Sequence, residues 1–277
     1  MGKPVQKVQS GIHQFKSESR IQALLSDRGM RTFPTHVILE EWFRQKPALN
    51  AVLALPGSDS TPATATALTA YTVANKDFEI VGVNAATANA TFHITGGITL
   101  TTASTSGDQM ILTPHLDTDQ SIWAGTKWNT GKQILMDAWI RTGASVAAMK
   151  IIAGFKLTNT PVVATNDDQA FFRYEAGVNN GCWQFISSRA GTDTTTSLEG
   201  ASTRITVTAS TLYRLTIEVD AARRVMAYIN GQKAFRTPLA ALADNIDLIP
   251  YVGVETATAG QKAITVLPPF RCGRLAA

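Results

Sequence analysis

The feature that most constrains this chain is a run of short strand-like segments that begins near residue 132 and continues almost to the end. Segment 133–141 alternates apolar and polar residues, with Ile134, Met136, Ala138 and Ile140 on one side, which is the period of a half-buried strand. Similar segments follow at 148–157, 169–174, 182–188, 203–207, 212–219, 224–229 and 263–266. No long amphipathic helix interrupts them, so the pattern predicts an all-β fold, an antiparallel sandwich.

Turn residues support the same prediction. Asn230-Gly231 stands between the segments 224–229 and 232–235, and both residue types accept the positive φ of a two-residue hairpin turn. Shorter strands are predicted at 78–83, 90–95, 97–102 and 109–112. The Thr- and Ala-rich stretch 58–70 is either a linker or an irregular strand, because threonine also suits a pleated surface. Residues 239–242 are expected to form a turn and no helix.

Length and cysteine content exclude several protein classes. The chain has 277 residues, enough for one large all-β domain with appendages. It has no run of eighteen apolar residues, so no membrane span is expected, and its first residues lack the apolar segment of a secretory signal. Cys182 and Cys272 are too few for a disulfide framework and are not at zinc-ligand spacing. Whether these two cysteines pair is left open.

The positive charge is concentrated at the start of the sequence. Residues 1–50 carry eight Lys/Arg and four acids, which accounts for the whole net charge of +4, whereas residues 51–277 carry seventeen of each sign. A nucleic-acid-binding domain would gather basic residues on a folded face, so direct nucleic-acid binding is not expected. We predict an extended or helical basic arm over 1–50 that docks on an acidic surface, a linker or irregular β segment over 51–75, and the sandwich over 76–277. A solvated leader with incidental charge is the alternative.

Two neighbouring segments resemble a known fold family. Residues 213–220 (YRLTIEVD) and 224–231 (RVMAYING) are similar to the paired strands near the C-terminal end of concanavalin-A-like jelly rolls, which include laminin-G-like and legume-lectin-like modules. The likeness covers roughly residues 105–277 and implies a jelly-roll sandwich. It does not imply an activity, since this architecture hosts lectins, hydrolases and structural modules.

A narrower resemblance concerns residues 96–102 (GGITLTT), 107–117 (GDQMILTPHLD) and 154–160 (GFKLTNT). These segments resemble the start of this module in virion structural proteins of tailed bacteriophages. Such proteins coat capsids or belong to tail and fibre assemblies, so the resemblance implies a class of protein and leaves its role open.

The sequence offers little for catalysis. Glycoside hydrolysis needs two carboxyl groups, which hydrolases of this fold carry as Glu-x-Asp-x-x-Glu or Glu-x-Asp-x-Glu on an inward-facing strand. The nearest match, Glu218-Val219-Asp220, has no second glutamate, and its neighbours place Glu218 on the outward face. No catalytic residues are expected, and the protein is expected not to be an enzyme.

Two groups of side chains have a spacing that would suit a metal ion. His115, Asp117 and Asp119 would point one way on a strand, although a polar loop after Pro114, in which Asp117 or Asp119 makes turn hydrogen bonds, is favoured. Asp167-Asp168 could hold calcium, but a solvated turn is favoured. No metal and no cofactor are therefore expected.

The leading hypothesis is a non-enzymatic virion structural protein on the particle surface, a capsid decoration protein anchored by its N-terminal arm. Its expected partners are the major capsid protein or other virion proteins, in a homo-oligomer and without membrane contact. The residues expected to bind the shell are Lys3, Lys7, Arg20, Arg28, Arg31, Val37, Leu39, Trp42 and Phe43.

The alternative hypothesis is a carbohydrate-binding tail or fibre module that recognises a host-surface glycan. Trp123 and Trp128 flank Gly125, and aromatic rings of this kind stack on sugars. Filling of the protein core competes with this role for both tryptophans. A glycan hydrolase is a third hypothesis, which lacks the paired carboxylates it needs.

Overall fold

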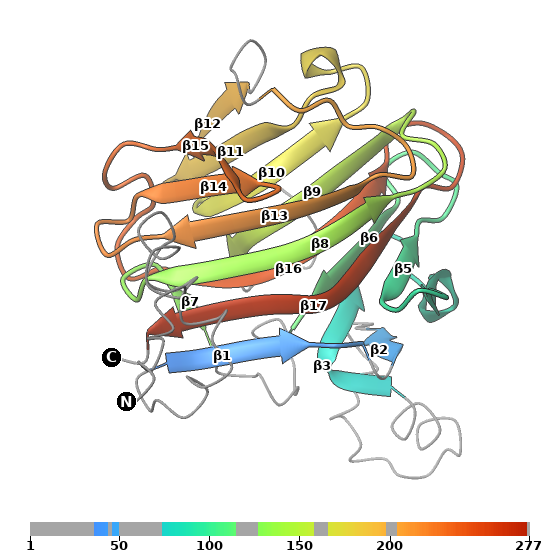
Figure 1. Ribbon diagram of the computed structural model, residues 1–277, viewed down its shortest axis with the longest axis horizontal. Helices are drawn as coiled ribbons and strands as arrows, with labels where there is room; N and C mark the ends of the chain where they lie inside the picture. Colours follow the sequence, from blue (N-terminus) through green and yellow to red (C-terminus); the bar gives the residue numbers. More distant parts are fainter. Residues whose placement is uncertain are drawn as a thin grey trace, which may run out of the picture.

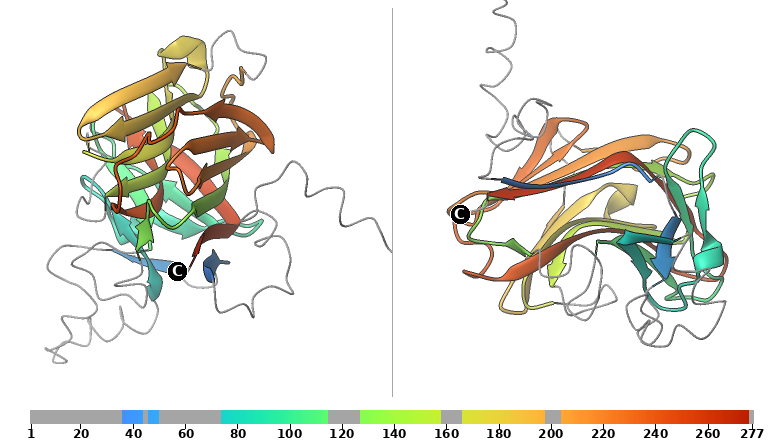
Figure 2. Two further views of the ribbon diagram at one scale, coloured as in Figure 1. Left: turned by 90° about the vertical axis from the view of Figure 1, so that its left-hand side faces the viewer. Right: turned by 90° about the horizontal axis from the view of Figure 1, so that it is seen from below.

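The computed structural model describes residues 36–43, 46–49, 74–114, 127–157, 166–197 and 204–275. Within these ranges the chain forms two β-sheets that pack face to face as a concanavalin-A-like jelly roll (Figures 1 and 2), as the sequence predicted. Two 3-10 turns, Thr87–Asn89 and Asn179–Gly181, are also present. None of the helical segments in the described ranges is long and apolar enough to span a bilayer.

Sheet A has eight strands. Its order is β15-β14-β13-β8-β17-β5-β4, and β1 also pairs with β17. The bounds are β1 (His36–Glu41), β4 (Ala90–Phe92), β5 (Ile98–Thr101), β8 (Ile134–Thr142), β13 (Leu212–Val219), β14 (Val225–Ile229), β15 (Gln232–Arg236) and β17 (Ala263–Leu275).

Sheet B has nine strands. Its order is β12-β11-β10-β9-β16-β6-β3-β2, and β7 also pairs with β16. The bounds are β2 (Lys46–Leu49), β3 (Ala74–Val81), β6 (Gln109–Thr113), β7 (Trp128–Asn129), β9 (Met149–Leu157), β10 (Gln169–Glu175), β11 (Gln184–Arg189), β12 (Thr192–Ser197) and β16 (Asp247–Thr256). The β2–β3 pair is parallel, so the sandwich is not antiparallel throughout.

The alternation that predicted β8 is the alternation that fills the core. Ile134, Met136, Ala138 and Ile140 are all fully buried between the sheets. Burial of an aliphatic side chain of this size stabilises the fold by about 1.5–3 kcal/mol. Sheet B contributes aromatic rings to the same core, and Phe172 contacts Phe185 edge to face with ring centroids 5.4 Å apart.

The β14–β15 hairpin confirms the turn prediction. Ile229 pairs with Gln232, and the two residues between them, Asn230 and Gly231, have φ of 53° and 79°. The predicted strand at 203–207 is wrong, because of its described residues only Thr206 pairs, in a single bridge with Cys182. Residues 239–242 form no helix, as expected.

The edge of β17 opposite β8 has two different partners. β5 pairs with its first residues, 263–266, and β1 pairs with its last, 270–275 (Figure 1). Leu39 and Phe43 enter the core from this side and are buried. Residues 36–43 therefore belong to the sandwich, which corrects the prediction that the whole of 1–50 is a separate arm. The same correction applies to 46–49, which form β2 and pair with β3 in sheet B. The remaining residues of that arm and most of the predicted linker lie outside the described residues.

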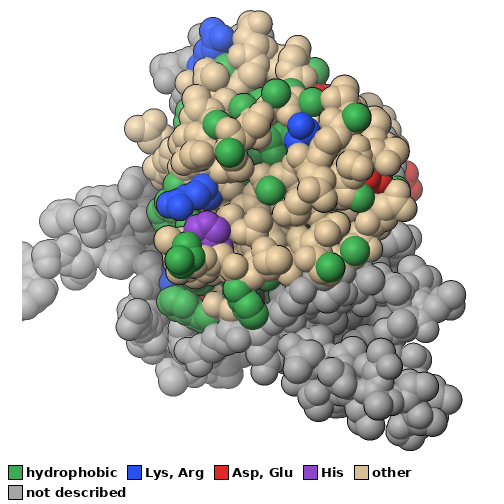
Figure 3. Space-filling model, turned by 90° about the vertical axis from the view of Figure 1, so that its right-hand side faces the viewer, with side chains coloured by type: hydrophobic (Ala, Val, Ile, Leu, Met, Phe, Trp, Pro, Cys, Tyr) green, Lys and Arg blue, Asp and Glu red, His purple; other side chains and the backbone are tan. Residues whose placement is uncertain are grey.

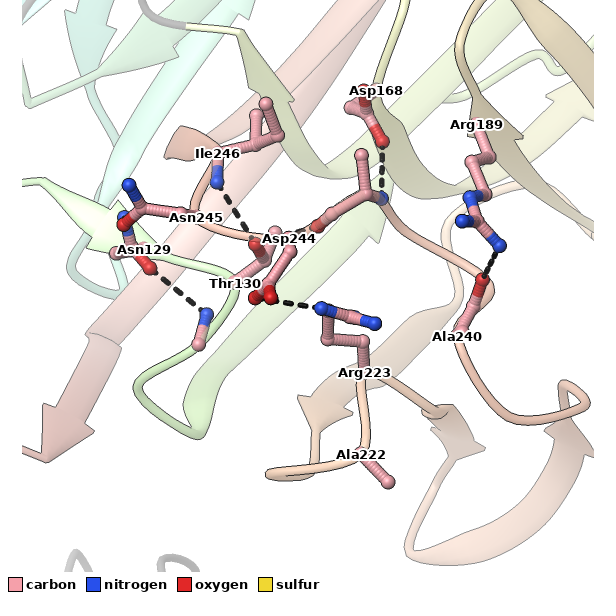
Figure 4. Close-up of polar contacts among 12 residues, drawn as sticks. Asn129, Thr130, Asp168, Arg189, Ala222, Arg223, Ala240, Asp244, Asn245 and Ile246 are labelled. Carbon is pink, nitrogen blue, oxygen red and sulfur yellow. Dashed lines mark hydrogen bonds and ion pairs between the residues drawn. The ribbon is translucent and has the colours of Figure 1, made fainter.

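The segment 237–246 crosses from β15 in sheet A to β16 in sheet B and is fixed from several sides (Figure 4). Arg223, in the turn after β13, pairs with Asp244 at 2.6 Å. The Ala243 amide donates to Asp168 at 2.7 Å, and the Thr130 hydroxyl donates to the Ala243 carbonyl at 2.8 Å. The prediction of a solvated turn is wrong for Asp168, which is buried. Burial raises the pKa of this carboxyl, and the hydrogen bond from the Ala243 amide opposes the shift.

Candidate functional site

The structure gives two of the predicted anchoring residues another role. Leu39 and Phe43 lie in the core, and the Phe43 ring contacts Phe78 with centroids 6.2 Å apart. Their expected burial against a shell is wrong, because their own sandwich already covers them. Val37 is half-buried, and Trp42 has 43% of its surface exposed. The basic residues Lys3, Lys7, Arg20, Arg28 and Arg31 lie outside the described residues.

Trp128 is not available to a glycan. It pairs with Leu248 through β7 and β16, and its side chain is fully buried in the core. The stacking role predicted for it is therefore wrong, and core filling, the competing interpretation, is confirmed. Trp123 lies outside the described residues.

The two carboxylates considered for catalysis have different hydrogen-bond partners. Glu218 faces outward from sheet A, as expected, but it is buried, and the Tyr228 hydroxyl donates to it at 3.4 Å. Burial and then the neighbouring Glu218 raise the pKa of Tyr228 to about 12. Asp220 accepts the backbone N–H groups of Ala222 and Arg224 at 2.9 Å each. Glu218 and Asp220 thus each hold their own local contacts.

No metal site emerges from the residues that the structure describes, which contain no group of three or more His, Cys, Asp or Glu suited to an ion. His115, Asp117 and Asp119 lie outside the described ranges. Cys182 and Cys272 are both free and buried, so the question of their pairing is answered.

The outer face of sheet B carries a second apolar cluster. Its members lie on six strands and are buried although they point away from the core: Val81, Ile111, Ile152, Phe171, Ile186 and Tyr251. At its centre Gly154 pairs with Phe171 on one side and Tyr251 on the other, and the two rings lie 6.3 Å apart. A Cβ at position 154 would lie 2.5 Å from Phe171 Cβ, so only glycine allows this close approach.

Polar groups lie beside this cluster, and some lack partners. Lys156 is two residues beyond Gly154 on the same face, and the β9–β10 register sets it beside Gln169. Lys156, Gln169 and Tyr251 are 1%, 2% and 0% exposed. Gln169 Nε2 donates to Ser188 at 3.2 Å, but Gln169 Oε1 and the Tyr251 hydroxyl have no hydrogen-bond partner. Burial raises the pKa of Tyr251, so this hydroxyl stays protonated. We call Gly154, Lys156, Gln169, Phe171 and Tyr251 the outer-face site.

Towards the other end of the same face the polar side chains satisfy one another. Lys150 pairs with Glu255 at 2.9 Å and with Glu175 at 3.6 Å. Burial lowers the pKa of Lys150, but the two carboxylates outweigh it, and the net shift is upward. Arg173 donates twice to Gln184 Oε1, at 3.1 and 3.0 Å.

The outer face of sheet A provides a contrast. Asp137 is buried there and accepts both nitrogens of a bidentate Arg214, at 2.8 and 3.0 Å, together with the Thr216 hydroxyl at 2.7 Å. The same guanidinium lies 5.6 Å from the centre of the Trp139 ring. The carboxylate of Asp137 is therefore fully paired, whereas Gln169 Oε1 and the Tyr251 hydroxyl of the outer-face site have no partner.

Apolar side chains are also exposed on other parts of the surface. The face in Figure 3 shows them scattered among polar groups with few charges. In the β4–β5 hairpin, Phe92 is 56% and Ile94 is 96% exposed. Single exposed apolar residues are ordinary on soluble proteins, and these two define no site.

Sequence reasoning missed the outer-face site. Two signals were present in β9: a glycine in the middle of a strand, which marks a close approach, and a lysine among apolar residues. Tyr251 gave no signal, because the strand that carries it was not predicted.

Comparison with known proteins identifies the fold. No protein-family model matches the chain, and no curated protein matches it by sequence. A protein of unknown function from Shewanella oneidensis is 12% identical, covers 87% of each chain and has a TM-score of 0.54. A family 66 carbohydrate-binding module from Bacillus subtilis has 8% identity, covers 70% of this chain and 94% of its own, and has a TM-score of 0.43.

A family 7 alginate lyase in complex with product has 14% identity, covers 71% of this chain and 94% of its own, and has a TM-score of 0.49. The last two likenesses are too distant to bear on function. The Shewanella protein shows a shared fold alone, so the function of this chain has to be sought in its own geometry.

Proposed function

We propose that this chain is a non-catalytic carbohydrate-binding module that holds a saccharide at the outer-face site of sheet B. This is the glycan-binding alternative from the sequence, now placed on β9, β10 and β16 in place of Trp128. No bond-making step is assigned to it.

The supporting observation is that two buried polar atoms of this site, the Tyr251 hydroxyl and Gln169 Oε1, have no hydrogen-bond partner. Leaving such a group unsatisfied costs about 1–3 kcal/mol, and native proteins satisfy the large majority of them. A ligand that donates to Gln169 and bonds to Tyr251 would remove this cost, once the side chains that now cover these two buried atoms have moved aside.

A saccharide has the complementary chemistry. Its hydroxyl groups donate and accept, which suits an amide oxygen beside a phenol. Its C–H faces pack on aromatic rings, and Phe171 and Tyr251 supply two rings in contact. Ligand sites are generally apolar with a few polar groups that fix the orientation, which is the composition of this face.

The test is the substitution Tyr251→Phe, which removes one oxygen and keeps the ring. Because the hydroxyl is buried and unsatisfied, we expect the free energy of unfolding to rise by about 1 kcal/mol. Saccharide binding, found first by screening a glycan array and then measured by calorimetry, should weaken roughly tenfold. A gain in stability together with a loss of saccharide affinity would indicate that the Tyr251 hydroxyl serves binding and not folding.

Tyr228→Phe is the matched control. Tyr228 is half-buried, and its hydroxyl bonds to Glu218 on the outer face of sheet A, so we expect a loss of stability and unchanged saccharide binding. If the wild-type protein binds no saccharide, or if Tyr251→Phe binds as tightly as wild type, the proposal is refuted.

Placement on a phage particle stays a prediction from the sequence resemblance, as do the capsid partner and the homo-oligomer. A carbohydrate-binding module displayed on a virion would join the two sequence hypotheses. Purified particles that contain the protein at defined copy number, by quantitative mass spectrometry, would support this placement, and its absence from them would exclude it.

A further inference from the structure

The last strand of sheet B has a free edge. Among the described strands β12 pairs with β11 alone and ends the order of the sheet, and it lies along the top of the molecule in Figure 1. Its first four side chains, from Thr192 to Thr195, are exposed. Unpaired N–H and C=O groups along such an edge are a template for another strand.

The hairpin that leads into β12 shows which backbone groups are free. Ala190-Gly191 forms its two-residue turn, with φ of 50° and 78°, and Arg189 pairs with Thr192 across it. The residues that flank such a turn exchange their backbone hydrogen bonds, and the direction of these bonds then alternates along the strand. The residues of β12 whose N–H and C=O groups point away from β11 are therefore Asp193, Thr195 and Ser197.

Other sheet edges in the described part of the chain carry features that hinder pairing. β15 presents Lys233 and Arg236, and its pairing with β14 is interrupted by a register shift. β1 carries two adjacent glutamates, β2 is four residues long and contains Pro47, and β4 and β7 have three and two residues. β12 (TDTTTS) has no Lys, Arg or Pro, and threonine suits strands.

We infer that β12 is a homodimer interface, at which it pairs antiparallel with β12 of a second copy and joins their two B sheets into one. The two-fold axis of such a dimer is perpendicular to the sheet, so residues opposite one another point to the same face. An axis through Thr195 meets this condition and uses every free position. Thr195 then pairs with the partner's Thr195, and Asp193 pairs with the partner's Ser197.

The charge pattern of β12 fits this register. Asp193 is its charged residue, and the Ser188 hydroxyl of the same subunit donates to the Asp193 carboxylate. In the dimer this carboxylate lies opposite a serine, and neutral threonines meet at the axis. An axis through Asp193 would set two carboxylates directly opposite, which is unfavourable. An axis through Thr194 would leave the free groups of residue 197 without a partner.

Thr195→Pro tests the strand pairing by sedimentation velocity. The Thr195 N–H points away from β11, so proline removes a bond to the second copy and none within the hairpin. Strand pairing alone buries little surface, so we expect a reversible wild-type dimer of micromolar affinity and at least roughly tenfold weaker association of Thr195→Pro, at an unchanged melting temperature. Thr195→Val keeps the N–H and the branched shape, and this matched control should dimerise as the wild type does.

Cross-linking tests the position of the axis. Cα atoms that oppose one another in such a pair are about 5.5 Å apart, a distance that a disulfide spans. Mild oxidation of Thr195→Cys should therefore give a covalent dimer on a non-reducing gel, and the native cysteines are buried. Thr192→Cys lies far from its own copy in this register, and it should stay monomeric on the gel.

Several outcomes would overturn the inference. These are a wild-type protein that is monomeric up to millimolar concentration, a dimer that persists in Thr195→Pro, or a dimer in which Thr195→Cys does not cross-link. Equal loss of the dimer in Thr195→Pro and Thr195→Val would also overturn it, because the hydroxyl and not the backbone would then hold the copies together. No saccharide enters these measurements, so their result leaves the proposed carbohydrate-binding function untouched.

Discussion

Lys156 makes the stability of this protein depend on pH in a direction that can be worked out. Burial lowers its pKa from 10.5 to about 7, whereas in the unfolded chain the amine keeps its ordinary value. Between these two values the unfolded state binds more protons, so the free energy of unfolding rises with pH. The loss of folding stability caused by burying this lysine is fully present below pH 7 and decreases as the pH approaches 10.5.

Lys156→Met removes the titrating group and keeps an apolar chain of similar length. One pKa unit corresponds to 1.36 kcal/mol. Integrating the linkage relation shows that the difference in free energy of unfolding between variant and wild type shrinks by about 3–4 kcal/mol from pH 7 to pH 10. We expect the variant to be more stable than the wild type at pH 7 and close to it at pH 10.

Urea unfolding followed by tryptophan fluorescence at pH 6, 7, 8, 9 and 10 measures both proteins without any ligand. Other titrating groups are common to both and cancel in the difference. Lys233→Met is the control and should differ from wild type by a constant amount. If the Lys156→Met difference is also constant over this range, the lysine is not desolvated and the reasoning about its environment is refuted.

Four further substitutions test the fold. Leu39→Ala should lower the free energy of unfolding by about 2–5 kcal/mol, because β1 is a strand of the sandwich, whereas Trp42→Ala should cost under about 1 kcal/mol; equal small losses in urea unfolding would contradict the strand. Asp137→Asn should cost about 1–3 kcal/mol, since it weakens the bidentate bond to a partly exposed Arg214, and a melting temperature equal to that of the wild type would speak against a structural network. Gly154→Ala should destabilise by about 1–3 kcal/mol or more, because the new Cβ meets the β10 backbone; an unchanged melting curve would show that β10 yields.

Local pattern was sufficient for much of the fold. The alternation in 133–141 and the Asn230-Gly231 turn predicted β8 and the β14–β15 hairpin, since both depend on neighbours in sequence. β12 was missed because it is an exposed edge strand of threonines with no apolar face to alternate.

β16 was missed for a different reason, because Pro250 argues against a central strand. Thr113 donates to the Pro250 carbonyl. The carbonyl and the nitrogen of Pro250 therefore both point to the edge of β16 along which β7 pairs with 247–248 and β6 pairs with 252–255. The missing N–H therefore falls in the gap between these two partners and breaks no bond of the ladder.

The outer-face site depends on the pairing register of β9 with β10 and β16, which cannot be deduced from the sequence. Nothing near Lys156 in the chain shows that Gln169 and Ile249 flank it while glutamates flank Lys150. In the same way, the apolar residues from Val37 to Phe43 predicted that this segment is buried against another surface. Only the pairing of β1 with β17 shows that this surface belongs to the same chain. Long-range pairing decided both questions.

The pairing of β1 with the last part of β17 joins residues about 230 positions apart. While the protein is being synthesised, β1 leaves the ribosome long before its partner exists and must wait with its apolar residues uncovered. Contacts of such high contact order slow the folding of a domain. The exposed β1 would be a natural binding site for a chaperone on the nascent chain, and sheet A can close only after residues 270–275 have left the ribosome.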